Sequence, residues 1–510
     1  MSKKALIRST GVIGFATATS RVLGFVRDIV IARFFGTAVY AQAFVIAFRI
    51  PNLLRDLIGE GAMNAAFVPV LTDELTKKGK KDFLELAQVI FNILFWVLAF
   101  LTVLGVILSP LIVRLIAPGF IADKAKFDVT VTLTRFLFPF LLLVGLWAYA
   151  MGVLNSLKIF AAPAFGPAAL NLSIILCAMW FGEDVFGLAM GVLAGGLLQL
   201  AIQLPPLYMN GWKFSLTRRF SHPKAKSIGR LLLPRALGAC VYQVNVFVST
   251  ILASLSSIVG DGAVAALYYA NRVWQLPLAI FGIALAQAVL PTMSRHVALN
   301  DTAKLKETLH FSLNVLLFIL IPSTIGLIIL AEPITKVLFQ RGAFTSYSTG
   351  ITASALLFYS IGLVACGGIK VLVNAFYSMH DTMTPVKTAI GSLVINVVLN
   401  LALMFPMKIA GLALATSISA IFNFVALYIL LERRLGDFGR TLIIDTFSRV
   451  LSAGLVMGVF LWLIVMRFTN FGLSHLVFSI ISGIAVFLIS SYLFGVKEMK
   501  DFAAWAQKRR

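Results

Sequence analysis

Acidic side chains are scarce in this sequence of 510 residues, in which Asp and Glu number 21 against 43 Lys and Arg. Charged residues of both signs make up only 13%, whereas a soluble domain usually carries about a quarter. Hydrophobic residues make up 60%, and the mean hydropathy is +0.95. The composition argues against a soluble globular domain and predicts a protein of the lipid bilayer.

Cysteine is also rare, and the usual catalytic motifs are missing. Cys177, Cys240 and Cys366 lie in apolar stretches without paired spacing, which predicts neither a disulfide framework nor a thiolate metal site. The sequence contains no GxxxxGK[ST], HExxH or CxxC motif and no nucleophile, base and acid set. We therefore expect a protein that is not an enzyme and that has no cofactor and no metal site.

A net charge of +22 would favour nucleic-acid binding in a soluble protein. That interpretation requires a basic face with stacking aromatic residues on a water-soluble module, and the sequence contains none. We expect no nucleic-acid partner.

Apolar segments long enough to cross about 30 Å of hydrocarbon recur along the chain. The first follows a basic start and continues without a cleavage site, so we interpret it as a membrane helix. About fourteen spans are predicted. Their limits are 9–35, 38–70, 86–113, 129–153, 161–181, 186–208, 228–255, 263–291, 309–330, 347–376, 385–405, 409–431, 445–466 and 473–495.

Lysine and arginine are unevenly shared between alternate loops. The N-terminus, the run TKKGKKD, residues 213–230 and the tail QKRR all fall on one side. The acidic connections GED and GDG fall on the other side. Because positive residues are retained on the cytoplasmic side, both termini are predicted to be cytoplasmic.

A weak internal repeat has an offset of about 224 residues. The segment GLAMGVLAGGLLQL from Gly187 resembles GLALATSISAIFNF from Gly411, and Pro69 and Pro291 lie in similar surroundings. Two six-span bundles of equal orientation, with a cavity between them, would give this offset. The last two spans have no partner in the repeat, so scaffolding and a dedicated function both remain open for them. The predicted divisions are 1–220, 221–436 and 437–510.

Ten basic residues fall within the predicted spans, where each costs about 2.5 to 3.5 kcal/mol at a helix centre. They are Arg21, Arg27, Arg33, Arg49, Arg55, Arg135, Arg235, Arg272, Lys370 and Arg449. Those near span ends, such as Arg33, Arg235 and Arg449, can reach the headgroups. The acids in these spans are Asp28, Asp56 and Glu60, so an anionic ligand must supply the missing negative charge.

The candidates for a substrate cavity are Arg21, Arg27, Arg49, Arg55, Arg272 and Lys370. Arginine suits an anionic substrate because it binds phosphate through a planar, permanently charged group. Arg21 and Asp28 share a helix face, and Asp28 is a candidate to hold an arginine in place. Pro51 and Pro277 lie beside these charges, where either a packing kink or local unwinding is possible. The supporting cavity residues are predicted to be Ser20, Asp28, Asn52, Glu60 and Lys370.

Small and amide residues have a simpler interpretation. Gly187, Gly191 and Gly195 form a GxxxG pattern that is typical of helix packing. The amides in apolar spans are interpreted as hydrogen bonds between helices rather than as ligands; they are Asn155, Asn171, Asn396 and Asn400.

Five segments resemble the MurJ (MviN) lipid II flippases of the MATE-like superfamily. They are ATSRVLGFVRDIVIARFFG, FRIPNLLRDLIGEGAMNAAFVPVL, YYANRVWQLPLAIFGIALAQAVLP, LFQRGAFT and VNAFYSMHDTMTPVK. The resemblance implies an all-α polytopic fold with two six-helix lobes and two C-terminal helices, in the bacterial inner membrane. It also implies export of lipid II by alternating access, with Arg21, Arg27, Arg55 and Arg272 binding the pyrophosphate headgroup. The extra helix pair would hold the polyprenyl tail, and cell-wall synthesis proteins are further candidate partners.

The chain departs from this family at several polar positions. Gln42, Asn271 and Gln275 stand where relatives often carry acids, which disfavours a mechanism that needs those carboxylates. Ser249, Asn396 and Asn400 occupy the positions of a proposed cation site without any carboxylate, which disfavours sodium coupling. Three other functions remain open: a MATE-type antiporter of organic cations, a flippase for another polyprenyl-linked sugar, and a membrane scaffold that recruits cell-wall enzymes.

Overall fold

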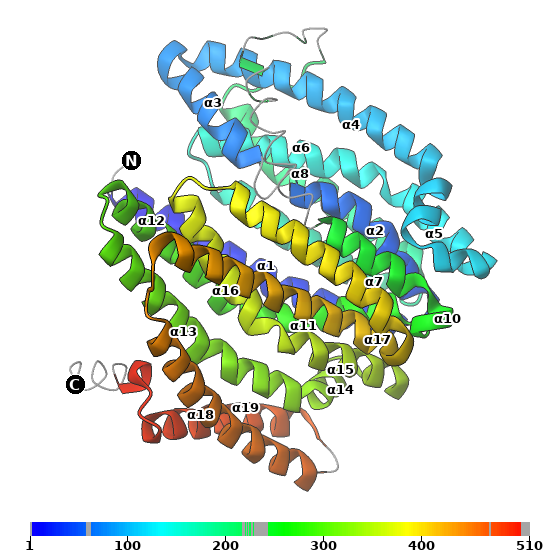
Figure 1. The fold of residues 1–510 in the computed structure, drawn as a ribbon. Helices are drawn as coiled ribbons and strands as arrows, with labels where there is room; N and C mark the ends of the chain where they lie inside the picture. The colour runs from blue at the N-terminus through cyan, green and yellow to red at the C-terminus, as the bar shows by residue number, and fades with distance from the viewer. Residues whose placement is uncertain are drawn as a thin grey trace. The chain divides into compact units, whose positions relative to one another are not determined.

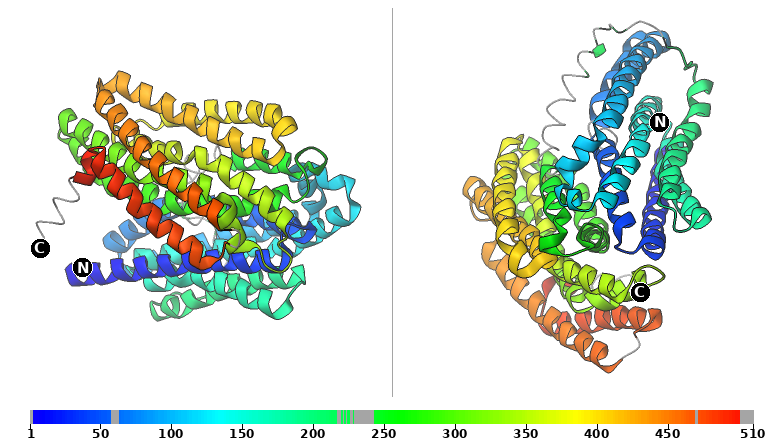
Figure 2. Two further views of the ribbon diagram at one scale, coloured as in Figure 1. Left: turned by 90° about the horizontal axis from the view of Figure 1, so that it is seen from below. Right: turned by 90° about the vertical axis from the view of Figure 1, so that its right-hand side faces the viewer.

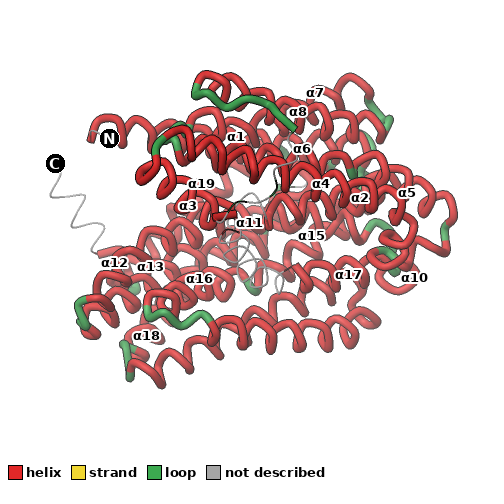
Figure 3. Tube along the Cα trace, turned by 90° about the horizontal axis from the view of Figure 1, so that it is seen from above, coloured by secondary structure: helices red, strands yellow, loops and turns green. Residues whose placement is uncertain are grey.

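The computed structural model describes residues 3–57, 63–216, 243–468 and 471–500, together with 220, 222, 224, 225 and 228 (Figure 1). Within these ranges the regular elements are helices, and no strand is present (Figure 3). The predicted all-α fold of a polytopic membrane protein is confirmed.

The chain divides into two compact units, and the first contains Met1–Leu255 and Arg341–Phe344. Its helices are α1 (Lys3–Phe35), α2 (Val39–Leu57), α3 (Met63–Lys78), α4 (Lys80–Ile116), η2 (Pro118–Ala122), α5 (Lys124–Leu137), α6 (Pro139–Ser156), α7 (Ala161–Phe181), α8 (Val185–Met209) and Gln243–Ser254. Within this unit α7 packs against both α1 and α8, and α6 packs against α8.

The second unit contains Ser256–Gln340 and Thr345–Arg510. Its helices are α10 (Ser256–Val259), α11 (Ala263–Pro277), η3 (Leu278–Ile283), α12 (Ala284–Ala298), α13 (Thr302–Ile329), α14 (Ala331–Phe339), α15 (Ser346–Ile361), α16 (Leu363–Ser378), α17 (Met383–Leu435), α18 (Arg440–Arg467) and α19 (Leu473–Leu493). The predicted boundaries at 220 and 436 remain predictions.

In the described part of the chain, nine helices are long and apolar enough to cross a membrane, or ten if α15 and α16 form one span with a 44° bend. The 53-residue α17 holds two predicted spans, because Lys408 interrupts it with a non-helical φ of 52°. Neither α1 nor α2 passes this apolar test. They are the helices in which most of the predicted cavity charges lie, and those charges lower their hydropathy.

The glycine ladder of α8 lies against α7, as the sequence predicts. A Cβ atom added at Gly191 would lie 2.9 Å from the Ile174 Cα atom, and one at Gly195 would lie 2.9 Å from the Leu170 Cα atom. The Ser173 hydroxyl also donates a hydrogen bond of 2.9 Å to the Gly191 carbonyl. The absence of side chains therefore allows the two backbones to approach closely.

We expect Gly191→Ala to destabilise the protein by about 1 to 3 kcal/mol, because the new methyl group meets backbone that cannot move alone. The thermal midpoint of the purified protein in detergent would measure this loss. Gly326→Ala is the matched control, since nothing lies within 4 Å of a Cβ atom at that position in α13. Equal midpoints for both variants would contradict the packing role of the ladder.

The last two helices are tied to the second unit through α13. In Figure 1 and in both views of Figure 2, α18 and α19 lie side by side, and α18 packs along α13. Gly454 and Gly458 face Ile325 of α13, and Gly483 of α19 faces Leu461 of α18. This pair is therefore packed in the same way as the ladder helices, through small residues.

A short loop segment joins the first unit although its flanking residues belong to the second. The Ala343 amide donates a 2.8 Å hydrogen bond to the Arg33 carbonyl at the end of α1. Gly36 and Gly342 have φ angles of +54° and +58°, and a Cβ atom at either would clash with the facing backbone. The glycines of the LFQRGAFT segment and of the α1–α2 turn thus permit this close approach.

Candidate functional site

Arg27 and Asp28 form a buried ion pair in the middle of the first unit's helix layer. Their side chains are only 8% and 2% exposed, and Arg27 Nη2 lies 2.8 Å from Asp28 Oδ1. Arg27 Nε lies 3.1 Å from the same oxygen, and Nη1 donates to Asn171 Oδ1 of α7 at 3.0 Å. The protein itself thus binds all three guanidinium nitrogens of Arg27.

Asn171 extends this network back along α1. Its Nδ2 donates a 3.0 Å hydrogen bond to the carbonyl oxygen of Ser20, one of the predicted cavity residues. The adjoining Gly24 leaves room for the amide, since a Cβ atom there would lie 3.3 Å from Asn171 Nδ2. The prediction that Asn171 bonds between helices is confirmed, and the network fixes α1 against α7.

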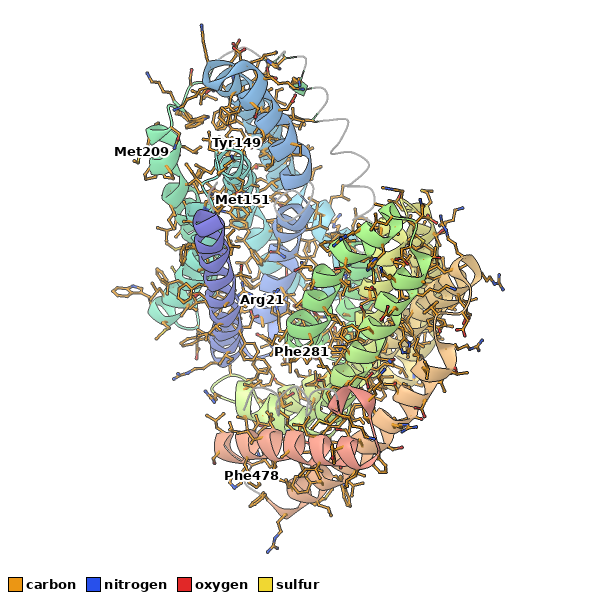
Figure 4. All side chains as sticks on the ribbon, turned by 90° about the vertical axis from the view of Figure 1, so that its left-hand side faces the viewer. Arg21, Tyr149, Met151, Met209, Phe281 and Phe478 are labelled. Atoms are coloured by element: carbon orange, nitrogen blue, oxygen red, sulfur yellow. The ribbon has the colours of Figure 1, made fainter. Side chains whose placement is uncertain are left out.

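Arg21 differs from Arg27 in its surroundings. Its side chain is exposed and makes no hydrogen bond or ion pair with any described residue. Figure 4 shows it on α1. Asp28 does hold an arginine, as the sequence predicts, but this arginine is its neighbour Arg27 and not Arg21, with which it shares a helix face. Seven residues separate Arg21 and Asp28 by about 10 Å along the helix axis, and the adjacent guanidinium is closer.

The predicted α2 residues are only partly described. Arg49 donates from Nη1 to the Val246 carbonyl at 3.2 Å, which links α2 to the helix Gln243–Ser254. Asn52 is half-buried. The backbone of Arg55 lies in α2, but its side chain and that of Asp56 lie outside the described part, as do Glu60, Arg235 and Cys240.

Arg272 and Lys370 belong to the second unit. Arg272 is half-buried and lies over the Tyr268 ring at 4.9 Å from its centroid, and Nη2 donates to the Tyr268 hydroxyl at 3.2 Å. Lys370 is exposed on α16. The convergence of these groups with Arg21, Arg27 and Arg55 in one cavity remains a prediction.

Pro277 marks a change of helix type close to Arg272. Here α11 ends at Pro277, and the next six residues, Leu278–Ile283, form a π-helix before α12 begins. A π-helical turn within an α-helix is typical of functional sites, since the wider turn loosens the backbone ladder. Both interpretations of Pro277, a packing kink and local unwinding, remain predictions, because a π-helical turn is also an ordinary cause of a helix kink.

Gln42 binds a lysine that the sequence did not single out. Lys126, 4% exposed, donates from Nζ to Gln42 Oε1 at 3.2 Å and lies 4.1 Å from the Phe120 ring centroid. In the sequence Lys126 falls with Lys124 in the connection before the predicted span 129–153, outside the set of basic residues within spans. The nearby aromatic residue was the one available signal.

The amides of α17 bond to one another and to a serine. Asn396 Nδ2 donates to Ser419 Oγ at 3.2 Å, which joins the two halves of α17, and Asn400 Nδ2 donates to Asn396 Oδ1 at 2.7 Å. The structural interpretation of Asn396 is thereby confirmed, while Asn155 remains a prediction. Among the residues that the structure describes, no group of three His, Cys, Asp or Glu could hold a metal ion.

Two acids outside the candidate spans, one in α3 and one in the loop before α17, are paired with bases. Hydrogen bonds from the Lys224 and Lys77 side chains lower the pKa of Asp73 to about 2. Hydrogen bonds from the Thr384 backbone and side chain, and the charge of Arg434, lower the pKa of Asp381. These carboxylates already have partners and do not offset the positive charge within the spans.

A family model described as lipid II flippase MurJ matches residues 31–482. A probable lipid II flippase MurJ of Rhizobium meliloti (strain 1021) is 36% identical over 90% of this chain and 87% of its own length. A probable lipid II flippase MurJ of Vibrio cholerae is 34% identical over 98% of each chain.

Solved structures give the same assignment of fold. A lipid II flippase MurJ in an inward closed conformation matches with a TM-score of 0.79 and 26% identity, over 94% of this chain and 98% of that one. An inward-facing multidrug transporter of the MATE family matches with a TM-score of 0.69 at 15% identity, over 83% of this chain and 96% of that one, and this likeness concerns the fold alone.

Proposed function

The chain belongs to the lipid II flippase MurJ family, and from this membership we propose that it moves lipid II from the cytoplasmic to the periplasmic leaflet of the bacterial inner membrane. Both termini are cytoplasmic in this proposal, as the distribution of loop charges favours. Lipid II is the substrate, and cell-wall synthesis proteins are candidate partners.

Arginines of both units bind the pyrophosphate headgroup in our proposal. The main support for this proposal is the state of Arg21. Its exposed guanidinium lies in the middle of α1 and has no partner among the described residues. Arg55 and Arg272 complete the binding set, and Lys370 supports it. A charged group held within the membrane without protein compensation favours an anionic ligand.

Arg27 has a different task in this mechanism. Because Asp28 and Asn171 occupy its nitrogens, it holds α1 in register with α7. Substrate phosphate would compete with Asp28 for this guanidinium as the lobes change state. The proposal thus assigns Arg27 and Asp28 to the conformational step and Arg21 to first recognition of the substrate.

The positive charges of the proposed cavity favour the membrane potential as the driving force for transport. Moving one charge through 100 mV is worth about 2.3 kcal/mol, and the cavity is cationic. Gln42, Asn271 and Gln275 carry no titratable group, so proton coupling through these positions is disfavoured.

Export of organic cations, the MATE-type alternative, requires free carboxylates within the spans. Asp28, the acid of α1, is bound by Arg27 and is not available to a cation.

Purified protein in liposomes loaded with labelled lipid II separates the two functions, lipid II transport and cation export. We expect the label to become accessible in the opposite leaflet, and no efflux of an organic cation dye. Dye efflux without lipid II movement would overturn the proposal.

A further inference from the structure

An apolar groove of the second unit lies between α13, α16, α17 and the start of α18. Its volume is about 240 Å³, and Leu313, Phe424 and Phe447 are among its walls. Tyr428 of α17 and Arg440, the first residue of α18, are the polar residues that line it. The apolar wall would bind a hydrocarbon chain, and the Tyr428 phenol and Arg440 guanidinium would bind a polar group. The groove therefore suits an amphiphilic ligand.

The Tyr428 hydroxyl needs a partner that no described residue supplies. The atom is buried and makes no hydrogen bond in the described part of the chain. The Tyr428 ring lies 4.8 Å from that of Phe438, which places it near the loop that joins α17 to α18. A buried hydroxyl without a partner is costly, so an acceptor oxygen from a ligand at this depth would stabilise the site.

Arg440 offers the matching charge at the same end of the groove. Its side chain is 65% exposed, and its ion pair with Glu432 is long, at 3.9 Å. Arg433 and Arg434 lie in the last turn of α17. The Lys306 side chain lies near the following loop, since its Nζ atom would be 3.3 Å from a Cβ atom added at Gly436. Clusters of basic residues at the cytoplasmic edge of membrane helices attract anionic lipids.

We propose that this groove binds an anionic phospholipid. One acyl chain lies along the apolar wall, the phosphate pairs with Arg440, and an ester carbonyl accepts the hydrogen bond of Tyr428. A polyprenyl hydrocarbon has no acceptor for that hydroxyl. The residues that line the groove also include none from α19, so the groove is not one formed between the two last helices. The proposal goes beyond transport and does not depend on it.

Native mass spectrometry of the full-length protein, stripped of lipid in detergent, tests this site with phosphatidylglycerol and phosphatidylcholine as probes. We expect tighter binding of phosphatidylglycerol. Arg440→Gln is expected to weaken it about fivefold, as one basic residue contributes at an anionic surface. Tyr428→Phe should weaken the binding of both lipids, because each carries ester carbonyls that would accept the hydrogen bond. This variant removes only one oxygen atom from the protein.

Arg467→Gln is the matched control, because Arg467 is an exposed arginine at the other end of α18. Unchanged phosphatidylglycerol affinity in both Tyr428→Phe and Arg440→Gln, with thermal midpoints equal to the wild type, would overturn the proposal. It would also be overturned if a polyprenyl phosphate displaced phosphatidylglycerol and itself bound less tightly to Tyr428→Phe. Loss of phosphatidylglycerol affinity in Arg440→Gln but not in Arg467→Gln supports it.

Discussion

Replacing Arg21 with alanine is expected to abolish growth rescue in a flippase-depleted bacterium, while the protein stays in the membrane in normal amount. The Arg21 side chain is exposed and bonds to no described residue, so its loss removes no stabilising contact. The variant would remove the charge-assisted hydrogen bonds that Arg21 makes to the pyrophosphate in our proposal, and each such bond is worth about 1.5 to 3 kcal/mol.

Two further variants separate recognition from stability at this position. Arg21→Lys keeps the charge but loses the bidentate geometry, so we expect partial rescue. Arg467→Ala removes an exposed arginine at the end of α18 and should rescue growth fully. Immunoblots of membrane fractions report the amount of each protein. Full growth with Arg21→Ala at normal abundance would contradict the role of Arg21 in binding.

Arg27→Ala is expected to reduce both stability and transport, because it removes the guanidinium that pairs with the buried Asp28 carboxylate. Breaking a buried ion pair on one side costs about 3 to 5 kcal/mol. The two side chains are 8% and 2% exposed, so solvent cannot replace the lost interaction. The thermal midpoint in detergent and growth rescue are the two measurements.

The double variant Arg27→Met with Asp28→Leu separates the two effects. Replacing both members of a buried pair with apolar groups of similar size is often neutral for stability. We therefore expect the thermal midpoint to recover while transport stays lost. Recovery of growth together with stability would show that the pair serves folding alone. A midpoint that stays low would contradict the account of Arg27 and Asp28 as a buried ion pair whose one-sided removal causes the loss of stability.

The fold followed from the sequence because bilayer thickness and hydropathy determine where spans lie. The bend of α15 and α16 at Gly362 lies inside the predicted span 347–376 and escaped prediction, whereas the turn at Lys408 falls in the predicted gap between the spans that end at 405 and begin at 409. The bend depends on packing around single residues. No periodicity in the sequence reports it.

The candidate site was predictable in its residue types and less so in its pairings. A positive excess within the spans indicated an anionic ligand, but one of the partners of Arg27 is Asn171, which is far away in sequence on α7. Burial of Lys126 depended in the same way on Gln42 and Phe120. Side-chain partners set by contacts between helices cannot be read from spacing along one helix.

Lipid II binding by the purified protein tests the central claim most directly. Native mass spectrometry would compare the wild type with Arg21→Ala and with Arg467→Ala, each incubated with the same amount of lipid II. The account predicts a one-to-one complex in the wild type and in Arg467→Ala, and its loss in Arg21→Ala. A complex of undiminished abundance in Arg21→Ala would contradict it.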